Sequence, residues 1–273
     1  FIGLCHEIAS MERQLPSLME TEFENIEIKA GGLNHFSILL EAKYKDTNED
    51  GYPKIRNNFN NYYSTLVNEH DDYHRSKPGG ERGVFFELYK IYGYLPITTD
   101  SHLGEYIQWA YSVADHEAIL DFYEKYRKKC LSFYESEESY KDFFDLNKKP
   151  KERITSIIEG IVNDINYEEA AVNLPNKGYI EYLPENIVVE VPGIIGRDNV
   201  EGIKLKNYPS DFASLLMNQT SVMRLTAEAI LEKSKMKALK ALLADPIVDN
   251  VTVAEKLLNN MIDLQAEYLG YLN

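Results

Sequence analysis

Residues 26–44 have the sequence IEIKAGGLNHFSILLEAKY, in which two runs rich in apolar residues flank small and polar ones. Alternation of apolar and polar residues with a period of two is typical of β-strands. Between the runs, Gly31 and Gly32 suit either a sharp bend or a close approach of two backbones, just before Asn34 and His35. The stretch therefore predicts two strands with a histidine beside their connection.

The rest of the chain favours helices over strands. We expect a short buried strand to end within residues 1–5, and the run IVVEV at 187–191 predicts another strand. Periodicity predicts helices at 62–92, with a break at 76–83, and at 151–165 and 210–229. Ser101 is expected to cap a long helix that continues through 105–129. A helix at 238–243 should stop before Asp245-Pro246, and a capping box at 252–255 should start the last one. We therefore expect one helix-dominated α+β domain with a small mixed or antiparallel sheet.

Charge and composition restrict the function classes. The chain of 273 residues has a net charge of −15, which argues against a nucleic-acid partner because phosphate binding requires a clustered basic face. No apolar run is long enough for a membrane span, and the first residues lack the pattern of a signal peptide. The only two cysteines, Cys5 and Cys130, do not make a disulfide framework. This usage favours a reducing compartment, and we expect a cytoplasmic protein.

Cys5, His6 and His35 are the first candidates for chemistry. A thiolate and an imidazole are good ligands for a divalent transition-metal ion, and two protein ligands would leave coordination positions for substrate oxygens. The alternative is a buried free cysteine beside an incidental histidine, and the spacing alone favours that alternative.

Asp100, His102 and Glu105 form a second group at a predicted junction of loop and helix, in GYLPITTDSHLGEY (93–106). They could supply an acid and a base, or they could be a capping aspartate beside a solvated histidine and glutamate. His70 and His74 are spaced as ligands on one helix face, although neighbouring acids favour a surface location. Neither GGERG nor GIIGRD has the setting of a dinucleotide-binding fingerprint, and no GxSxG motif is present.

The order of four motifs resembles the C-terminal portion of glycoside hydrolase family four, the NAD- and metal-dependent glycosidases, over nearly the whole chain. The motifs are GLCHE (3–7), GGLNHF (31–36), YGYLPITTDSHLGEY (92–106) and LPNKGYIEYLPENIVVEVP (174–192). The resemblance implies a fold like the C-terminal domain of lactate dehydrogenase, and NAD and a divalent metal ion, expected to be Mn²⁺, as cofactors. The cysteine–histidine pair in CHEI is most similar to the α-galacturonidase branch, with α-galactosidases next.

The same resemblance implies roles for individual residues. Cys5 and His35 match the metal ligands of the family, and Asn34 matches a residue that contacts the sugar or the cofactor. His6 stands where some relatives carry a general acid, and we expect it also to contact substrate. The proton-abstracting base is expected among three residues of the third motif, Asp100, His102 and, as second choice, Tyr94. In the same motif we expect Glu105 to bind substrate.

The resemblance also implies a mechanism and a missing part. NAD oxidises C3 of the sugar, the metal ion stabilises charge on the neighbouring oxygens, a base removes the C2 proton, and the hydride returns after water has replaced the leaving group. Relatives begin with a Rossmann domain, which this sequence lacks. We therefore expect 1–273 to be the catalytic, substrate-binding and dimerisation domain of a truncated enzyme that acts on a small sugar or uronide as a homodimer or homotetramer. The alternatives are a 2-hydroxy-acid dehydrogenase domain and a non-enzymatic oligomerisation module.

Overall fold

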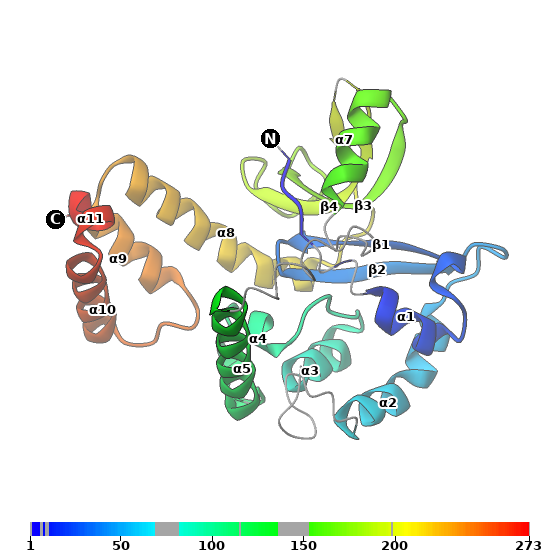
Figure 1. The fold of residues 1–273 in the computed structure, drawn as a ribbon, viewed down its shortest axis with the longest axis horizontal. Coiled ribbons are helices and arrows are strands. Elements are labelled where there is room, and N and C mark those ends of the chain that lie inside the picture. The colour runs from blue at the N-terminus through cyan, green and yellow to red at the C-terminus, as the bar shows by residue number, and fades with distance from the viewer. Residues whose placement is uncertain are drawn as a thin grey trace.

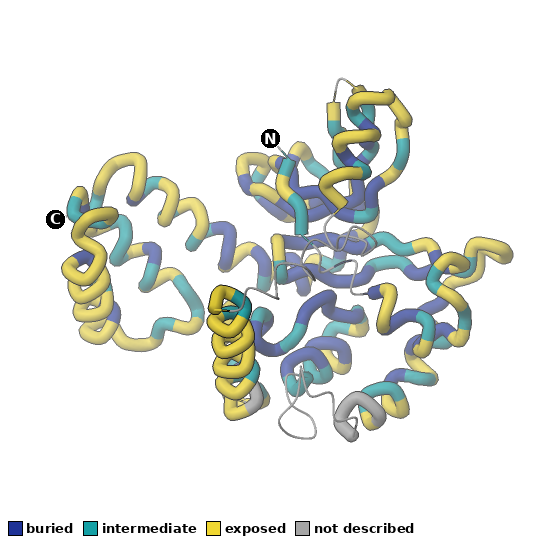
Figure 2. Tube along the Cα trace, in the orientation of Figure 1, coloured by how far each residue is buried: buried dark blue, intermediate teal, exposed yellow. Residues whose placement is uncertain are grey.

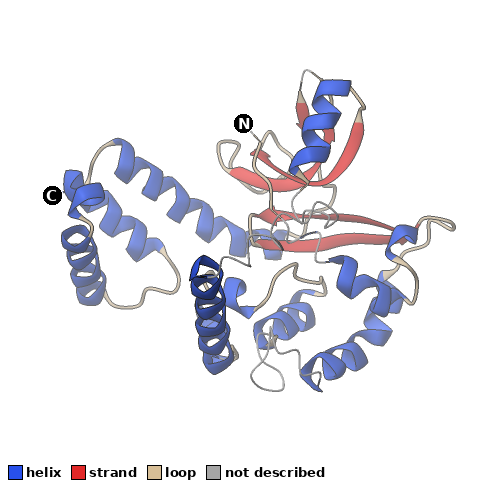
Figure 3. Ribbon diagram, in the orientation of Figure 1, coloured by secondary structure: helices blue, strands red, loops and turns tan. Residues whose placement is uncertain are grey.

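The computed structural model describes residues 2–5, 8, 11–68, 82–114, 116–135, 153–197 and 199–272 (Figures 1 and 3). Helices outnumber strands, and the described strands pair only antiparallel, which confirms the predicted α+β class. The strands are β1 (Ile26–Leu33), β2 (Phe36–Tyr44), β3 (Tyr167–Pro175), β4 (Val188–Ile195) and β5 (Val200–Gly202). The helices before β3 are α1 (Met11–Met19), α2 (Tyr52–Asn68), α3 (Gly83–Tyr92), α4 (Asp100–Leu103), α5 (His116–Glu135) and α7 (Ile154–Asn163), with 3-10 turns η2 (Phe23–Asn25) and η3 (Gln108–Ser112).

The sheet has the strand order β2-β1-β4-β3, with β5 paired to β4. The β1–β2 hairpin runs from the pair Ile26–Tyr44 to the pair Leu33–Phe36, so Asn34 and His35 form its tip. The prediction of two strands within 26–44 is confirmed. Both glycines lie inside β1 and not at the bend, which decides between the two alternatives in favour of close backbone approach.

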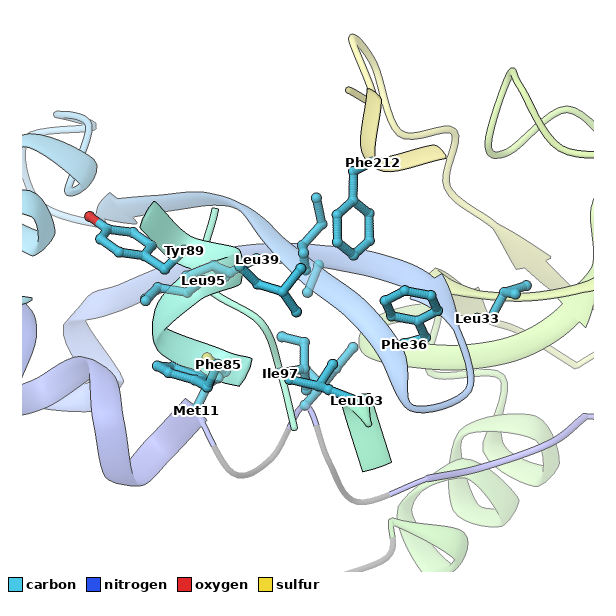
Figure 4. Packing of buried hydrophobic residues seen from close by; sticks show 14 of the residues in the cluster. Met11, Leu33, Phe36, Leu39, Phe85, Tyr89, Leu95, Ile97, Leu103 and Phe212 are labelled. Atoms are coloured by element: carbon cyan, nitrogen blue, oxygen red, sulfur yellow. The ribbon is translucent and has the colours of Figure 1, made fainter. Parts of the chain in front are cut away.

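The hairpin is covered on one face by α1, α2 and α3 (Figure 1). Among its inward side chains, Leu39 lies beside Leu95 and Phe36 packs edge-on against Phe212, and all four are fully buried (Figure 4). Burial of each such side chain contributes about 1.5–3 kcal/mol to folding. A smaller cluster lies under α7, where it joins β3 and β4 through Ile157, Val172, Leu174 and Ile195. The hairpin tip is thus attached to a rigid core.

The C-terminal helices form an arm that extends away from the sheet (Figure 1). They are α8 (Ser210–Leu231), α9 (Lys235–Ala244), α10 (Val251–Leu264) and α11 (Ala266–Leu269), followed by the 3-10 turn η4 (Gly270–Leu272). Only the start of α8 enters the core, through the fully buried Phe212, and much of the arm is exposed (Figure 2). The predicted helices at 210–229 and 238–243 are confirmed. The cap of the last helix was predicted wrongly, because the side chain of Asn250 accepts a hydrogen bond from Val253 N, and Thr252 lies inside α10.

Two other predictions of local structure are wrong. The long helix from Ser101 ends at Leu103, because turns of the i→i+3 type follow and η3 separates α4 from α5. Residues 2–5 form no strand; Gly3 makes one isolated bridge to Asn173 and is exposed. The loop predicted at 76–83 lies mostly outside the described residues, with α2 and α3 on its two sides. Within the described ranges, no helix has the length and the apolar character needed to cross a membrane.

Candidate functional site

Cys5 and His35 meet in the folded chain. Gly3 N donates to Asn173 O at 3.1 Å and Asn173 N donates to Gly3 O at 2.9 Å, which fixes the N-terminal segment along β3 two residues before the thiol. His35 projects from the tip of the β1–β2 hairpin. The Sγ of Cys5 lies 3.1 Å from Nε2 of His35, and both side chains are half-buried. Residues that are 30 positions apart therefore share one open site.

The hairpin tip holds His35 in an uncommon backbone conformation. Its φ is +115°, a value that few residues other than glycine adopt. Two contacts from distant elements secure it: Thr98 Oγ1 donates to His35 O at 2.9 Å, and Asn34 Nδ2 donates to Glu190 Oε2 at 3.3 Å. Glu190 is almost fully buried on β4. Strain that neighbouring structure maintains is concentrated at functional sites in proteins, and here it directs an imidazole toward a thiol.

Two residues of the third motif lie beside this pair. The ring centroids of His102 and His35 are 4.4 Å apart, with the planes tilted by 54°. Glu105 follows α4, where burial raises the pKa of its carboxyl and the nearby His102 opposes that rise. The structure therefore brings His102 to the Cys5–His35 pair and places an acid next to it.

Asp100 has a different position from the one that the sequence led us to expect. Its side chain is fully buried, and Oδ1 accepts a hydrogen bond from Phe85 N at 3.1 Å, at the start of α3. Burial raises the pKa of Asp100, and hydrogen bonds from the first backbone amides of α3 offset part of this rise. The carboxyl group of Asp100 thus binds the start of α3, and this position does not support a role as the base that removes a proton from a sugar.

Tyr94 is also remote from the pair. It packs edge-on against Tyr52 with ring centroids 6.0 Å apart. The next residue, Leu95, accepts a hydrogen bond from Leu39 N, whereas Thr98 is the residue that contacts His35. Leu39 follows His35 by four residues along β2, which corresponds to about 13 Å of extended strand. This separation argues against Tyr94 as the base.

Sequence reasoning missed Tyr106, whose ring stacks on Phe36 at a centroid distance of 5.2 Å. Burial, reinforced by the nearby Glu105, Asp245 and Cys5, raises the pKa of Tyr106 to about 12. The phenol of Tyr106 is therefore neutral at ordinary pH. The prediction of one long helix concealed it, because the turns after Leu103 are what direct Tyr106 toward the hairpin.

Glu190 and Asn173 were also missed. They are opposite each other on β4 and β3, and Gly32 of β1 pairs with Glu190 on the other side. The side chain of Asn173 is buried, and its Oδ1 and Nδ2 have no hydrogen-bond partner among the described residues. Only the register of the sheet relates these positions to the hairpin tip, so the sequence offered no signal for them.

The donor atoms of Cys5 and His35 fit a divalent metal ion. Thiolate sulfur and imidazole nitrogen are donors that divalent transition-metal ions accept, and at a separation of 3.1 Å both could reach one ion. Among the residues that the structure describes, no three His, Cys, Asp or Glu side chains are arranged so that together they could hold a metal ion. His6, and the His70–His74 pair, lie outside those residues.

Comparison with known proteins identifies the family. Residues 30–248 match the model of the Family 4 glycosyl hydrolase C-terminal domain. The chain belongs to this family. It is 42% identical over 296 aligned positions to an alpha-glucosidase of Erwinia rhapontici and 26% identical over 286 positions to an alpha-galacturonidase of Thermoanaerobacter italicus. These alignments cover 100% and 98% of this chain, and 63% and 62% of the relatives, so the chain spans less than two thirds of their length.

Solved structures of the family have the same fold. The Bacillus subtilis protein lplD superimposes with a TM-score of 0.77 at 25% identity, covering 95% of this chain and 62% of that one. A 6-phospho-alpha-glucosidase from gut microorganisms, solved in complex with NAD and Mn²⁺, superimposes with a TM-score of 0.69 at 19% identity, covering 96% and 60%. The predicted fold class is thereby confirmed. Membership of this family also replaces the hydroxy-acid dehydrogenase alternative.

Proposed function

We propose that this chain is the metal- and sugar-binding part of a longer α-glycosidase that uses NAD and a divalent metal ion. Membership of family 4 supports the reaction class, and the 42% identical alpha-glucosidase supports an α-glycosidic substrate. The observation that carries the proposal is the 3.1 Å approach of the Cys5 thiol to the His35 imidazole. The boundaries 1–273, as a domain that follows a nucleotide-binding one, belong to the same proposal.

Cys5 and His35 would hold the ion at the hairpin tip, since the thiolate and the neutral imidazole are the forms that bind metals. The chemistry that the ion and NAD supply when bound is Lewis acidity toward sugar oxygens and reversible hydride transfer. Asn34, exposed beside His35 and hydrogen-bonded to Glu190, would bind a sugar hydroxyl or the cofactor. The known complex of a relative with NAD and Mn²⁺ supports both cofactors.

His102 is the favoured base among the three that we considered. Its ring is half-buried and contacts His35, so it borders the place where substrate oxygens would lie, and a neutral imidazole can accept a proton there. Asp100 is occupied at the start of α3, and Tyr94 lies against Tyr52. His6 stays a predicted acid and substrate contact, and Glu105 a predicted substrate contact.

For the sugar, we propose an α-glucoside. The alpha-glucosidase relative is 42% identical, whereas the alpha-galacturonidase is 26% identical, although the CHEI motif resembles the galacturonidase branch. A panel of aryl α-glucoside, α-galactoside and α-galacturonide, offered to the longer protein with NAD and Mn²⁺, separates these substrates. Preferential cleavage of the galacturonide would overturn the choice of glucose.

The metal site can be tested on this chain alone. Isothermal titration with Zn²⁺ and Mn²⁺ should give one site in the wild type, with Zn²⁺ bound more tightly because it ranks above Mn²⁺ in affinity for nitrogen and sulfur ligands. Cys5→Ser and His35→Gln should each weaken binding at least tenfold. Cys130→Ser removes the half-buried thiol of α5 and serves as the matched control. Equal binding by all four proteins would refute the site.

We also propose a homo-oligomeric protein of a reducing cytoplasm. Large apolar side chains such as Leu231, Leu264 and Tyr268 are exposed on the C-terminal arm, and a second copy could cover them. A reducing compartment would keep the ligand thiol of Cys5 unoxidised. Sedimentation equilibrium with and without Leu231→Glu tests the first statement, since a monomer for both proteins would contradict it.

A further inference from the structure

We propose a second binding site, separate from the hairpin tip, that takes a small molecule bearing a multivalent oxyanion such as a phosphate group. The site is a pocket of about 410 Å³, here named the lysine pocket. Eight residues line it, among them Glu41 and the lysines Lys29, Lys43, Lys204 and Lys206. Four of these eight residues are lysines, in a chain whose net charge is −15.

The lysine pocket is formed where the segment 203–206 crosses the β1–β2 hairpin. Backbone bonds fix the segment: Ile203 N donates to Pro192 O at 2.7 Å, and Leu205 N donates to Tyr179 O at 2.9 Å. The buried Leu205 lies directly over Gly31, where an added Cβ would be only 2.5 Å from its Cδ1. These contacts give the pocket a fixed apolar base on a rigid strand pair.

The charges of the lysine pocket are only partly compensated. Lys43 Nζ pairs with Glu41 at 2.8 Å, whereas Lys29, Lys204 and Lys206 have no ion-pair partner within 4.0 Å among the described residues. The hydrogen bond from Lys43 lowers the pKa of Glu41, and the nearby Lys29 and Lys206 lower it further. Glu27 and Asp50, which lie outside the lining, also act on Lys43. The lining itself has four ammonium groups and one carboxylate, so Lys29, Lys204 and Lys206 are available to an anionic ligand.

The lysine pocket is distinct from the Cys5–His35 site. Lys29 precedes Leu33, the last residue of β1, by four positions, which corresponds to about 13 Å of extended strand. Lys43 is farther still, near the other end of β2. A ligand in the lysine pocket would therefore leave the hairpin tip free.

The combination of an apolar base and a basic rim specifies the ligand class. Leu40, Ile203 and Leu205 can contact a carbon framework, while lysine ammonium groups can bind oxyanion oxygens as point charges. A volume of about 410 Å³ is in the range of small-molecule sites. Because the chain as a whole repels anions, affinity would come from these short-range contacts and would fall with added salt.

Isothermal titration of the metal-free chain with inorganic pyrophosphate and with inorganic phosphate, at low ionic strength, tests the proposal. We expect one site that prefers pyrophosphate. Lys29→Gln and Lys206→Gln should each weaken it about two- to fivefold, the range of one partly exposed charge pair. Glu41→Gln should tighten binding, because it removes the one carboxylate of the lysine pocket. Lys240→Gln, on the exposed face of α9, is the control that removes a lysine elsewhere and should have no effect.

Absence of one-to-one binding at millimolar pyrophosphate would overturn the lysine pocket as an anion site. So would an equal loss of affinity in Lys240→Gln and Lys29→Gln, since it would indicate nonspecific attraction. Tight binding of an acidic peptide with no binding of pyrophosphate would also overturn it, in favour of a protein partner. Cys5→Ser should leave pyrophosphate binding unchanged, so this test is independent of the proposed glycosidase.

Discussion

Replacement of Gly32 by alanine tests whether the hairpin tip depends on close backbone contact. Gly32 pairs with Ser37 on β2 and with Glu190 on β4, so backbone surrounds it on both sides. An added Cβ would overlap Phe36 O and lie 2.7 Å from Ser37 Cα, and both atoms belong to the backbone and cannot rotate away. The φ of +158° is also one that side-chain-bearing residues rarely adopt.

The expected cost follows from these two effects. Overpacking of a well-packed site costs about 1–3 kcal/mol, and a residue held in a sparsely populated backbone region costs about 1–3 kcal/mol. Gly32→Ala should therefore lower the free energy of unfolding by about 2–6 kcal/mol, a large part of the 5–15 kcal/mol that is typical of a folded protein. The strand would have to move two residues before Asn34, so Zn²⁺ binding should weaken as well.

Urea unfolding, followed by far-UV circular dichroism and by fluorescence of Trp109, the single tryptophan, measures this cost. Two glycines provide controls because an added Cβ would have no neighbour within 4 Å at either of them. Gly178, with φ of +81°, should show backbone strain alone, about 1–2 kcal/mol on change to alanine. Gly270, with φ of −58°, should be neutral or gain about 0.4–1 kcal/mol.

The reasoning would be refuted if the free energies of unfolding of Gly32→Ala and Gly270→Ala differed by less than about 1 kcal/mol, because backbone overlap should cost more than that. A cost equal to that of Gly178→Ala would show that strain matters at Gly32 and that contact with β2 does not.

Three further outcomes are expected. His35→Gly should be about 1 kcal/mol more stable than His35→Ala in urea, because only glycine accepts the φ of +115° without strain, while both variants should lose Zn²⁺. Burial raises the pKa of Asp100, so the folded state favours its neutral form. The free energy of unfolding of the wild type, relative to that of Asp100→Asn, should therefore fall as the pH rises through the folded pKa. Urea unfolding at a series of pH values measures this difference. Asn250→Ala should cost about 1 kcal/mol in thermal unfolding because it removes the cap of α10, whereas Thr252→Ala should be nearly neutral.

The regular elements were largely predictable because their signals are local. Alternating apolar residues located β1 and β2, and the proline after Asp245 marked the end of α9. The region after Ser101 was not predictable, since its apolar periodicity continues while the chain turns. Gly104 N bonds to Asp100 O there, and Asp100 is itself committed to the start of α3, a contact across 15 positions that no local pattern contains.

The candidate site was predictable in its parts and not in its assembly. Spacing alone favoured an ordinary buried cysteine, and only the resemblance to a family linked Cys5 with His35. The geometry adds what the order of motifs could not contain: the positive φ of His35, its contact with Thr98, and the support of Asn34 by Glu190. Each of these depends on sheet register, which relates positions far apart in the chain.

The attachment of Cys5 and His35 to different strands of one sheet links ion binding with folding. The thiol follows Gly3, which is fastened to the outer side of β3, whereas the imidazole leaves the turn between β1 and β2. Three adjacent strands, β1, β4 and β3, lie between these attachment points. An ion bound by both side chains would oppose separation of these strands. Because the ion would bind only the folded sheet, tighter binding would raise the free energy of unfolding of the sheet.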